Sequence, residues 1–290
     1  MSSKKLFFTE SISSFQNSRV KQVVKWRDRP ARDSDQIVLI EGYRALTRAL
    51  AGDYPVREVF VCPDFFQGEN EESLLFQLQS RGAKLYLVAP GPFAKMSYRD
   101  RPEGLLGLGP QIRHRLADLR VPPGPAFYLL AEQTEKPGNL GTILRSADAV
   151  GLDGLILCDS RTDLYNPNVV RASTGSLFTL PIAEAGGIET LSWLRERGIA
   201  VIAASPHAQQ LYSAVDLTIP LAIAVGAEQF GLSDLWLQAA TLSVRLPMFG
   251  AADSLNVATA TALLLYEVVR QRLAAGVLRD PGPIQEIADD

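Results

Sequence analysis

The sequence predicts an α/β protein made of two consecutive units, each with a sheet covered by helices. Three observations predict this class. The chain of 290 residues is too long for one average domain. Strand-like and helix-like stretches alternate along it. Several strand-like stretches are apolar at every position, which is typical of the strands of a buried parallel sheet. The apolar content of 47% and the charged content of 21% are those of an ordinary globular protein.

The first predicted unit spans residues 1–115 and is a small α/β layer fold. A helix is expected over residues 17–28, because Val20, Val23 and Val24 recur there at helical spacing between basic residues. The other elements of this unit follow in alternation along the chain: strand 36–40, helix 42–49, strand 56–62, helix 69–80, strand 84–88 and strand 104–109.

A linker is predicted at residues 116–125, which end in Val-Pro-Pro-Gly-Pro, because proline cannot continue a helix or a central strand. The second unit spans residues 126–275, and residues 276–290, rich in proline, glycine and acids, are predicted to be a mobile tail. The predicted elements of the second unit are strand 126–131, helix 141–150, strand 154–158, helix 167–172, strand 178–181, helix 188–197, strands 199–204 and 221–225, helix 233–239, strand 241–245 and helix 254–273.

The last predicted helix is apolar almost all round. Leucines and valines occur on every side of it, with many alanines between them. Such a helix has to be covered on every side, and one domain of this size offers too little surface to cover it. The sequence therefore favours a homodimer that buries part of this helix.

The composition favours a cytoplasmic protein. No apolar run reaches the roughly 18 residues of a membrane span, and the acid Glu10 interrupts the N-terminal stretch before a signal peptide could form. Cys62 and Cys158 stand alone in apolar runs and are interpreted as buried small hydrophobes. His114 and His207 have no cluster of further ligands, so no bound metal is predicted.

Charge is distributed unevenly between the two units. Residues 1–115 contain 18 Lys and Arg against 13 Asp and Glu, whereas residues 116–290 contain 11 against 19. Basic residues concentrate at the predicted first helix, which suits binding to phosphates of a nucleic acid. The alternative is a solvated helix face. The candidate RNA-binding residues are Arg19, Lys21, Lys25 and Arg27.

Three short segments of the second unit combine glycines with amide, charged or hydroxyl side chains at turns between strand-like and helix-like stretches. They are Asn139-Leu-Gly-Thr-Ile-Leu-Arg145, Gly226-Ala-Glu-Gln-Phe-Gly231 and Pro247-Met-Phe-Gly-Ala-Ala-Asp-Ser-Leu-Asn-Val257. In open α/β sheets, ligands bind where loops leave the carboxyl ends of the strands, and all three segments fall at such positions. The segments therefore predict one ligand site at this edge of the sheet.

Each segment also has a purely structural interpretation. Arg145 could pair with Asp148 on its own helix, and Glu228 could cap the following helix. Asp253 or Ser254 could cap the last helix. Asn256 has two interpretations, since it could bind a ligand or only the backbone. These alternatives stay open when the segments are considered one at a time.

Common nucleotide and hydrolase motifs are missing from the chain. There is no Gly-x-Gly-x-x-Gly after a strand, no Gly-x-x-x-x-Gly-Lys-Ser/Thr and no Gly-x-Ser-x-Gly. The turn Arg171-Ala-Ser-Thr-Gly-Ser176 resembles a phosphate-binding turn, but an ordinary helix-to-strand connection is the favoured interpretation.

The three segments, in this order, resemble the motifs of the SpoU (TrmH-type) branch of the SPOUT RNA methyltransferases. The resemblance runs from about residue 125 to residue 273 and includes Ser-Thr-Gly-Ser-Leu-Phe-Thr-Leu-Pro181. Residues 15–109 resemble the L30e-like substrate-binding domain often fused in front, through Asn17-Ser-Arg-Val-Lys-Gln and Val38-Leu-Ile-Glu-Gly-Tyr-Arg-Ala-Leu46.

The resemblance implies a parallel-sheet domain whose C-terminal part forms a trefoil knot. It also implies a homodimer with active sites at the interface, and S-adenosylmethionine bound in a bent shape by loops around Gly226, Leu246 and Leu255. A metal is not required. The implied reaction is methylation of a ribose 2′-hydroxyl of RNA, with ribosomal RNA favoured over tRNA.

The resemblance also implies roles for five residues. Arg145 activates the hydroxyl with the help of a substrate phosphate, and Asn139 holds its loop and the substrate. Glu228 supports the RNA and the loop geometry, while Ser254 and Asn256 complete the cofactor and ribose pocket. These assignments are expectations carried over by motif position.

The chain departs from the family pattern in the second motif. Where Gly-Asn-Glu is common, this chain has Gly226-Ala-Glu228, which removes one amide and puts substrate choice in doubt more than catalysis. Three alternatives remain open: a tRNA 2′-O-methyltransferase, a non-catalytic RNA-binding or ribosome-assembly factor, and methylation of a base. The motif arginine disfavours the last of these, and the otherwise intact motifs disfavour the second.

Overall fold

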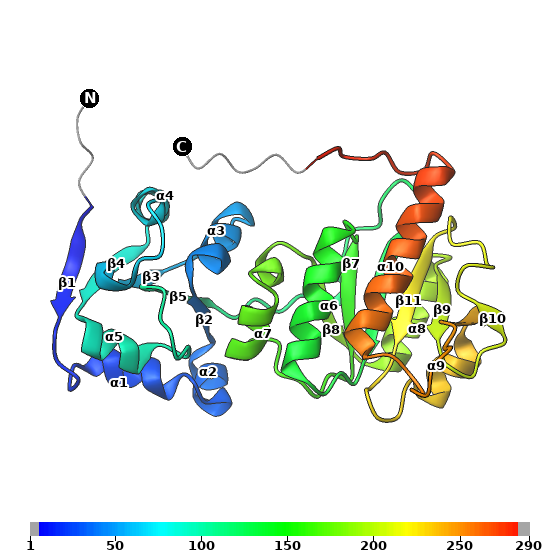
Figure 1. Ribbon diagram of the computed structural model, residues 1–290, viewed down its shortest axis with the longest axis horizontal. Coiled ribbons are helices and arrows are strands. Elements are labelled where there is room, and N and C mark those ends of the chain that lie inside the picture. The colour runs from blue at the N-terminus through cyan, green and yellow to red at the C-terminus, as the bar shows by residue number, and fades with distance from the viewer. Residues whose placement is uncertain (1–5, 284–290) are drawn as a thin grey trace. The chain divides into compact units, whose positions relative to one another are not determined.

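The computed structural model describes residues 6–283, which divide into two compact units (Figure 1). The first unit contains the described residues up to Ile112 together with Leu164–Thr179, and the second contains Arg113–Asp163 and the described residues from Leu180 onward. The predicted tail lies partly outside the described residues, and its residues 276–283 form neither helix nor strand. The predicted linker at 116–125 stays a prediction.

A five-stranded mixed sheet forms the centre of the first unit, in the order β1-β4-β3-β5-β2. The first three of these strands run parallel, and β5 pairs antiparallel with both of its neighbours. The edge strand β1 was not predicted, because three of its five residues are exposed and polar side chains interrupt its pattern. The strands are β1 (Phe8–Ile12), β2 (Ile37–Glu41), β3 (Glu58–Val61), β4 (Lys84–Val88) and β5 (Leu105–Pro110).

The helices of the first unit surround this sheet. Asn17 accepts a hydrogen bond from the backbone of Arg19 and so begins α1, which buries Val20 and Val23. Two short helices, α2 and α5, were not predicted because each begins around a proline and lacks a regular apolar stripe. The helices are α1 (Ser18–Lys25), α2 (Arg29–Asp35), α3 (Tyr43–Ala51), α4 (Glu71–Ser80), α5 (Pro90–Met96) and α7 (Pro167–Ala172).

Seven parallel strands form the sheet of the second unit, in the order β10-β12-β9-β11-β6-β7-β8. Every residue of β6, β7 and β11 is buried, which confirms the predicted buried parallel sheet. The strands are β6 (Phe127–Glu132), β7 (Gly154–Cys158), β8 (Ile182–Ala185), β9 (Ala200–Ala204), β10 (Gln210–Leu211), β11 (Leu221–Val225) and β12 (Leu242–Arg245).

Helices cover both faces of this sheet. On one face, α10 (Val257–Ala274) lies beside α6 (Pro137–Ala149) and reaches β11 (Figure 1). On the other face, α8 (Gly187–Glu196) and α9 (Asp234–Ala239) bury Trp193 and Trp236 against alternate residues of the strands. The carboxyl ends of the strands stay open between these layers, where the three motif segments lie.

Three predicted elements need correction. The strand expected at 178–181 is wrong: Ser176–Phe178 form a 3-10 turn, and the strand begins only at Ile182. A short apolar run cannot distinguish a strand from a buried turn. The helix expected from Gly141 begins at Pro137, because proline suits the first helical position. The last helix begins at Val257 and not at residue 254.

Cys62 and Cys158 are buried and unpaired, as predicted. Within residues 6–283, no group of three His, Cys, Asp or Glu is arranged to hold a metal ion. Across the same residues, no helix has the length and apolarity needed to span a membrane.

Candidate active site

A cavity of about 510 Å³ opens at the carboxyl ends of β9, β11 and β12, a size suited to a small ligand or cofactor. The loops after these three strands converge there with the N-terminal half of α10. Seven of the eight residues predicted for catalysis or cofactor binding line this pocket: Asn139, Gly226, Glu228, Leu246, Ser254, Leu255 and Asn256. The eighth, Arg145, does not.

The second motif forms a closed loop at the end of β11. Ala227 and Gly231 exchange two backbone hydrogen bonds of 3.0 and 2.9 Å, which bring the two ends of the loop together. A Cβ atom at Gly226 would lie 2.0 Å from the backbone carbon of Gly231. The close approach of these backbone segments therefore requires glycine at position 226.

Glu228 is held at the N-terminus of α6. Its carboxylate accepts hydrogen bonds from the Asn139 side chain at 2.7 Å and from the backbone N–H groups of Glu135 and Lys136 at 3.0 and 3.2 Å. Unpaired N–H groups and the helix dipole favour an anion at this place. Partial burial raises the pKa of Glu228, but these hydrogen bonds outweigh it and hold the pKa below the ordinary value.

Asn256 links the third motif to the first. Its side-chain oxygen accepts from the backbone of Ala258 at 3.0 Å and so caps α10, while its amide donates to the Asn139 oxygen at 3.1 Å. Glu228, Asn139 and Asn256 thus form one hydrogen-bonded chain that joins all three motifs. The cap of the last helix is Asn256, so the suggested caps Asp253 and Ser254 are wrong.

Glu132, at the end of β6, lies outside the pocket lining but fixes a neighbouring helix, a role that sequence reasoning missed. It is only 3% exposed, and it accepts hydrogen bonds from the backbone and the hydroxyl of Ser233 at 2.7 and 2.6 Å. These bonds fix the start of α9, so the suggested capping of this helix by Glu228 is also wrong. A carboxylate at the end of a fully apolar strand was the available signal.

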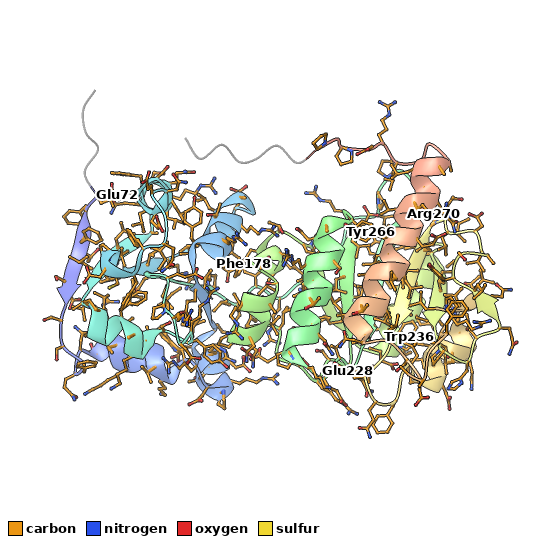
Figure 2. All side chains as sticks on the ribbon, viewed as in Figure 1. Glu72, Phe178, Glu228, Trp236, Tyr266 and Arg270 are labelled. Carbon is orange, nitrogen blue, oxygen red and sulfur yellow. The ribbon has the colours of Figure 1, made fainter. Side chains whose placement is uncertain are left out.

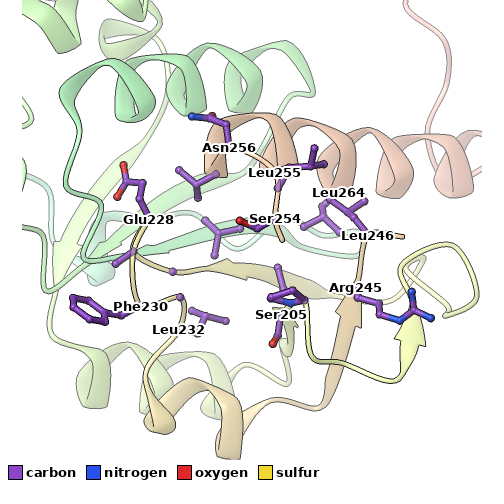
Figure 3. Close-up of a pocket in the computed structure, with 18 of the residues that line it drawn as sticks. Ser205, Glu228, Phe230, Leu232, Arg245, Leu246, Ser254, Leu255, Asn256 and Leu264 are labelled. Atoms are coloured by element: carbon purple, nitrogen blue, oxygen red, sulfur yellow. The ribbon is translucent and has the colours of Figure 1, made fainter. Parts of the chain in front are cut away.

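The pocket lining combines apolar and polar side chains. Figure 3 shows Leu246 and Leu264 near one end of the cavity, with Glu228 and Asn256 toward the other. Ser205, in the loop after β9, also lines the pocket. Sequence reasoning missed this loop, although β9 was predicted and its carboxyl end had to meet the same edge of the sheet.

Arg145 lies outside the pocket. It is the ninth residue of α6, is exposed, and forms no hydrogen bond or ion pair with any residue between 6 and 283, Asp148 included. Six residues along a helix correspond to about 9 Å of rise and a turn of roughly 120° to another face. Within one chain, Arg145 therefore faces away from the ligand site that its motif partner Asn139 lines.

The candidate RNA-binding residues, on α1 and in the turn just after it, differ in whether they already have protein partners. Arg19 pairs with Glu58 at 2.8 Å and lies over the Tyr86 ring, and Arg27 donates to the backbone carbonyls of Lys95 and Ser97. Lys21 and Lys25 are exposed. Two of the four candidates therefore already have partners that stabilise the first unit.

Removal of the Asn256 side chain should destabilise the second unit. We expect Asn256→Ala to lower the free energy of unfolding by about 1 kcal/mol or slightly more, because α10 loses its N-cap and Asn139 loses a donor. Asn256→Asp keeps the cap and should be less destabilising. Urea unfolding of the two variants measures the difference; equal stability of the alanine variant and the wild type would contradict the capping role.

The contribution of Glu228 should depend on pH in a defined direction. Because its folded pKa lies below the ordinary value of 4.5, the carboxylate stabilises the fold above that pH. This contribution is lost as the pH falls from 4.5 through the lower folded value. The stability difference between the wild type and Glu228→Gln should therefore be constant near neutrality and shrink in acid, as followed by urea unfolding from pH 7 to pH 3. A difference that grows in acid would contradict the hydrogen-bond geometry.

Two family models match consecutive parts of the chain. The SpoU rRNA Methylase family matches residues 126–266, and the MRM3-like substrate binding domain matches residues 17–107. The 23S rRNA (uridine(2479)-2′-O)-methyltransferase of Streptomyces viridochromogenes is 32% identical, over 84% of this chain and 86% of that protein.

Two solved structures share the fold over nearly their full lengths. An RNA 2′-O ribose methyltransferase is 40% identical with a TM-score of 0.79, over 91% of this chain and 99% of that one. An AdoMet-bound rRNA methyltransferase from Sinorhizobium meliloti is 30% identical with a TM-score of 0.81, over 90% and 97%. On these matches, and with the three motifs meeting at one pocket, the chain belongs to the SpoU rRNA methylase family.

Proposed function

We propose that this chain transfers a methyl group from S-adenosylmethionine to a ribose 2′-hydroxyl of ribosomal RNA. The observation that carries the proposal is the pocket that the three motifs close together, with Glu228, Asn139 and Asn256 in one hydrogen-bonded chain. The relatives reported above are RNA or rRNA methyltransferases by name, and one of them was solved with AdoMet. We also propose a cytoplasmic location, where bacterial ribosomal RNA is found.

The pocket suits S-adenosylmethionine in size and in chemistry. Its leucines, among them Leu232, Leu246 and Leu264, offer an apolar surface for the adenine ring, and the Ser205 and Ser254 hydroxyls can bond ribose or amino-acid groups. The loops at Gly226 and Leu255 would hold the cofactor through backbone groups. When bound, the cofactor supplies a methyl group that its sulfonium charge already activates.

The task of the protein is then to position the ribose and to help its hydroxyl lose a proton. The Arg145 guanidinium can hold the hydroxyl oxygen while negative charge develops there. A phosphate of the RNA substrate assists Arg145 in this activation. Alignment of the oxygen with the methyl group contributes further, since correct positioning removes much of the entropic cost. Asn139 and Glu228 keep the entrance of the pocket and the start of α6 in place.

We further propose a homodimer, and with it the trefoil-knotted topology of the family. In a single chain Arg145 lies outside the pocket lining, and α10 exposes Leu263 at 43% and Tyr266 at 53%. Figure 2 shows Tyr266 on α10. These apolar side chains and Arg145 lie on the outer surfaces of two neighbouring helices. A second copy docked there would cover the leucine and the tyrosine and bring Arg145 close to the pocket of its partner.

Charges placed on this surface should separate the proposed dimer. The double variant Leu263→Asp/Tyr266→Asp is expected to sediment as a monomer and to lose methyl transfer. Both side chains are exposed in the single chain, so its unfolding free energy should change little. Analytical ultracentrifugation at micromolar concentration measures the change. A wild-type protein that is strictly monomeric would contradict the proposal, as would full activity in a monomeric variant.

Tritiated methyl transfer tests the substrate class. The purified chain should label 23S rRNA, or a precursor particle that contains it, well above tRNA from the same cells. Label on tRNA alone would favour the tRNA alternative. An inactive chain that still binds rRNA tightly would favour the non-catalytic RNA-binding factor.

A further inference from the structure

The first unit contains a separate cavity of about 490 Å³. It lies between the N-terminal residues of α3, the loop that leads into α4, the loop after α5 and the turn after α7. All of these segments belong to the first unit. Its lining includes Arg44, Gln67, Glu71, Arg99, Glu103 and Arg171.

Three arginines give this cavity its positive character. Arg44 is exposed and has no hydrogen-bond partner within residues 6–283. Arg99 pairs with Glu103, but its Nε atom is buried without a partner among the described residues. Burial and the neighbouring Arg171 guanidinium lower the pKa of Arg99, while Glu41 acts in the opposite direction. An anion bound between two guanidinium groups relieves their mutual repulsion, so this arrangement favours anion binding.

Two helix N-termini face the same cavity. Tyr43, Arg44 and Ala45 begin α3, a helix of nine residues, and Glu71 begins α4, a helix of ten. Neither N-terminus has a side-chain cap. Free backbone N–H groups and the positive end of the helix dipole attract phosphate oxygens. At α3 this adds to the attraction of the arginines, whereas the first turn of α4 already carries the acids Glu71 and Glu72.

Glu71 supplies an independent sign of a ligand. The residue is only 4% exposed, and its Oε1 atom accepts hydrogen bonds from the backbone of Gln67 and Gly68 at 3.0 and 2.9 Å. Its Oε2 atom is buried and has no partner among residues 6–283. A buried acceptor without a hydrogen-bond donor lowers the stability of the protein, and a ligand that provides a donor removes this cost. A nucleotide offers such donors in its ribose hydroxyl and base N–H groups, besides its phosphate.

We infer that this cavity binds one nucleotide of the RNA substrate, with the phosphate held by Arg44 and Arg171 and a hydroxyl or base N–H donated to Glu71. The inference rests on the proposed function, because it takes RNA as the substrate. It gives a ligand to the turn Arg171–Ser176, whose Thr174 lines the cavity. It also moves RNA docking away from α1 and the turn after it, where Arg19 and Arg27 have protein partners. At the cavity, Arg171 donates one hydrogen bond to Asn168 at 3.1 Å and Arg44 has no partner among residues 6–283.

Binding of 23S rRNA to the full-length chain, without methyl transfer, tests the inference. The variant Arg44→Gln/Arg171→Gln should weaken binding at least tenfold and reduce the slope of log K against log salt by roughly 0.7 to 0.9, because both arginines hold the same phosphate. Glu71→Gln keeps an acceptor for the loop and should weaken RNA binding severalfold. Arg57→Gln, at an exposed arginine of the same unit outside the cavity, is the matched control and should bind as the wild type does. Melting curves confirm that each variant is folded.

Two outcomes would overturn the inference. One is a loss of rRNA binding in Lys21→Gln/Lys25→Gln with none in the cavity variant, which would make α1 the docking surface. The other combines two results: millimolar inorganic phosphate stabilises the wild type but not the cavity variant, and the cavity variant binds rRNA as the wild type does. Together they would make the cavity a site for small anions. Because neither readout needs methyl transfer, a failure of the proposed activity would be seen separately in the tritium assay.

Discussion

Arg145→Ala is expected to lower kcat for methyl transfer by at least about 100-fold, in the range seen when one group that stabilises developing charge is removed. The Kd for S-adenosylmethionine should stay within about threefold, because Arg145 lies outside the lining of the pocket. Calorimetry and tritium transfer measure the two quantities on the same preparation. Arg195→Ala, at an exposed arginine on α8, is the matched control and should keep full activity.

The same residue allows a sharper test of the proposed dimer. If Arg145 serves the pocket of the partner, a mixture of Arg145→Ala with a variant that cannot bind the cofactor should regain activity. In a mixed dimer, one of the two sites is intact, so random exchange predicts roughly a quarter of wild-type activity. No recovery, in a mixture shown to exchange subunits, would place Arg145 in its own pocket. Full activity of Arg145→Ala alone would remove it from the mechanism.

Gly226→Val is expected to weaken cofactor binding by at least about 30-fold. Even the Cβ atom of alanine would lie 2.0 Å from the Gly231 backbone and 2.2 Å from that of Leu232, and backbone cannot move aside as a side chain can. The loop must open, which breaks the hydrogen bonds between Ala227 and Gly231. A cost of about 2 kcal/mol or more is typical of such overpacking. If the bound loop has the geometry seen here, this cost alone weakens cofactor binding about 30-fold.

A matched glycine provides the control. A Cβ atom at Gly138 would meet nothing within 4 Å, and this residue lies in the first turn of α6. Gly138→Ala should therefore leave cofactor binding unchanged and stabilise the protein slightly, since alanine is the better helix former. Calorimetric titration with S-adenosylmethionine compares the two variants. Equal affinity of Gly226→Val and the wild type would contradict the role given to the second motif.

The central layers of both units could be predicted from the sequence, because burial on both faces leaves a plain pattern. Leu221–Val225 is apolar at every position and is fully buried between two neighbouring strands. The elements that were missed depend on tertiary contacts. The edge strand Phe8–Ile12 is mostly exposed, and the two-residue strand Gln210–Leu211 is too short for any periodicity.

The position of the candidate site could be predicted as well, because parallel strands bring their carboxyl ends to one edge of a sheet. The contacts of the individual residues inside the site could not be predicted from the sequence. Asn139 and Glu228 are 89 residues apart in sequence, and Asn139 and Asn256 are 117 apart, so no local pattern indicates that their side chains bond to one another. The orientation of Arg145 depended on where α6 begins, and the prediction placed that start four residues too late.

The chemical position of the transferred methyl group tests the central claim most directly. A methylated 2′-hydroxyl cannot attack the adjacent phosphate, so alkali leaves the modified position as a resistant dinucleotide. After tritium transfer from S-adenosylmethionine to 23S rRNA by the purified chain, the label should appear in such a dinucleotide, and Arg145→Ala should lose it. Label recovered in single nucleotides methylated on the base would contradict the account.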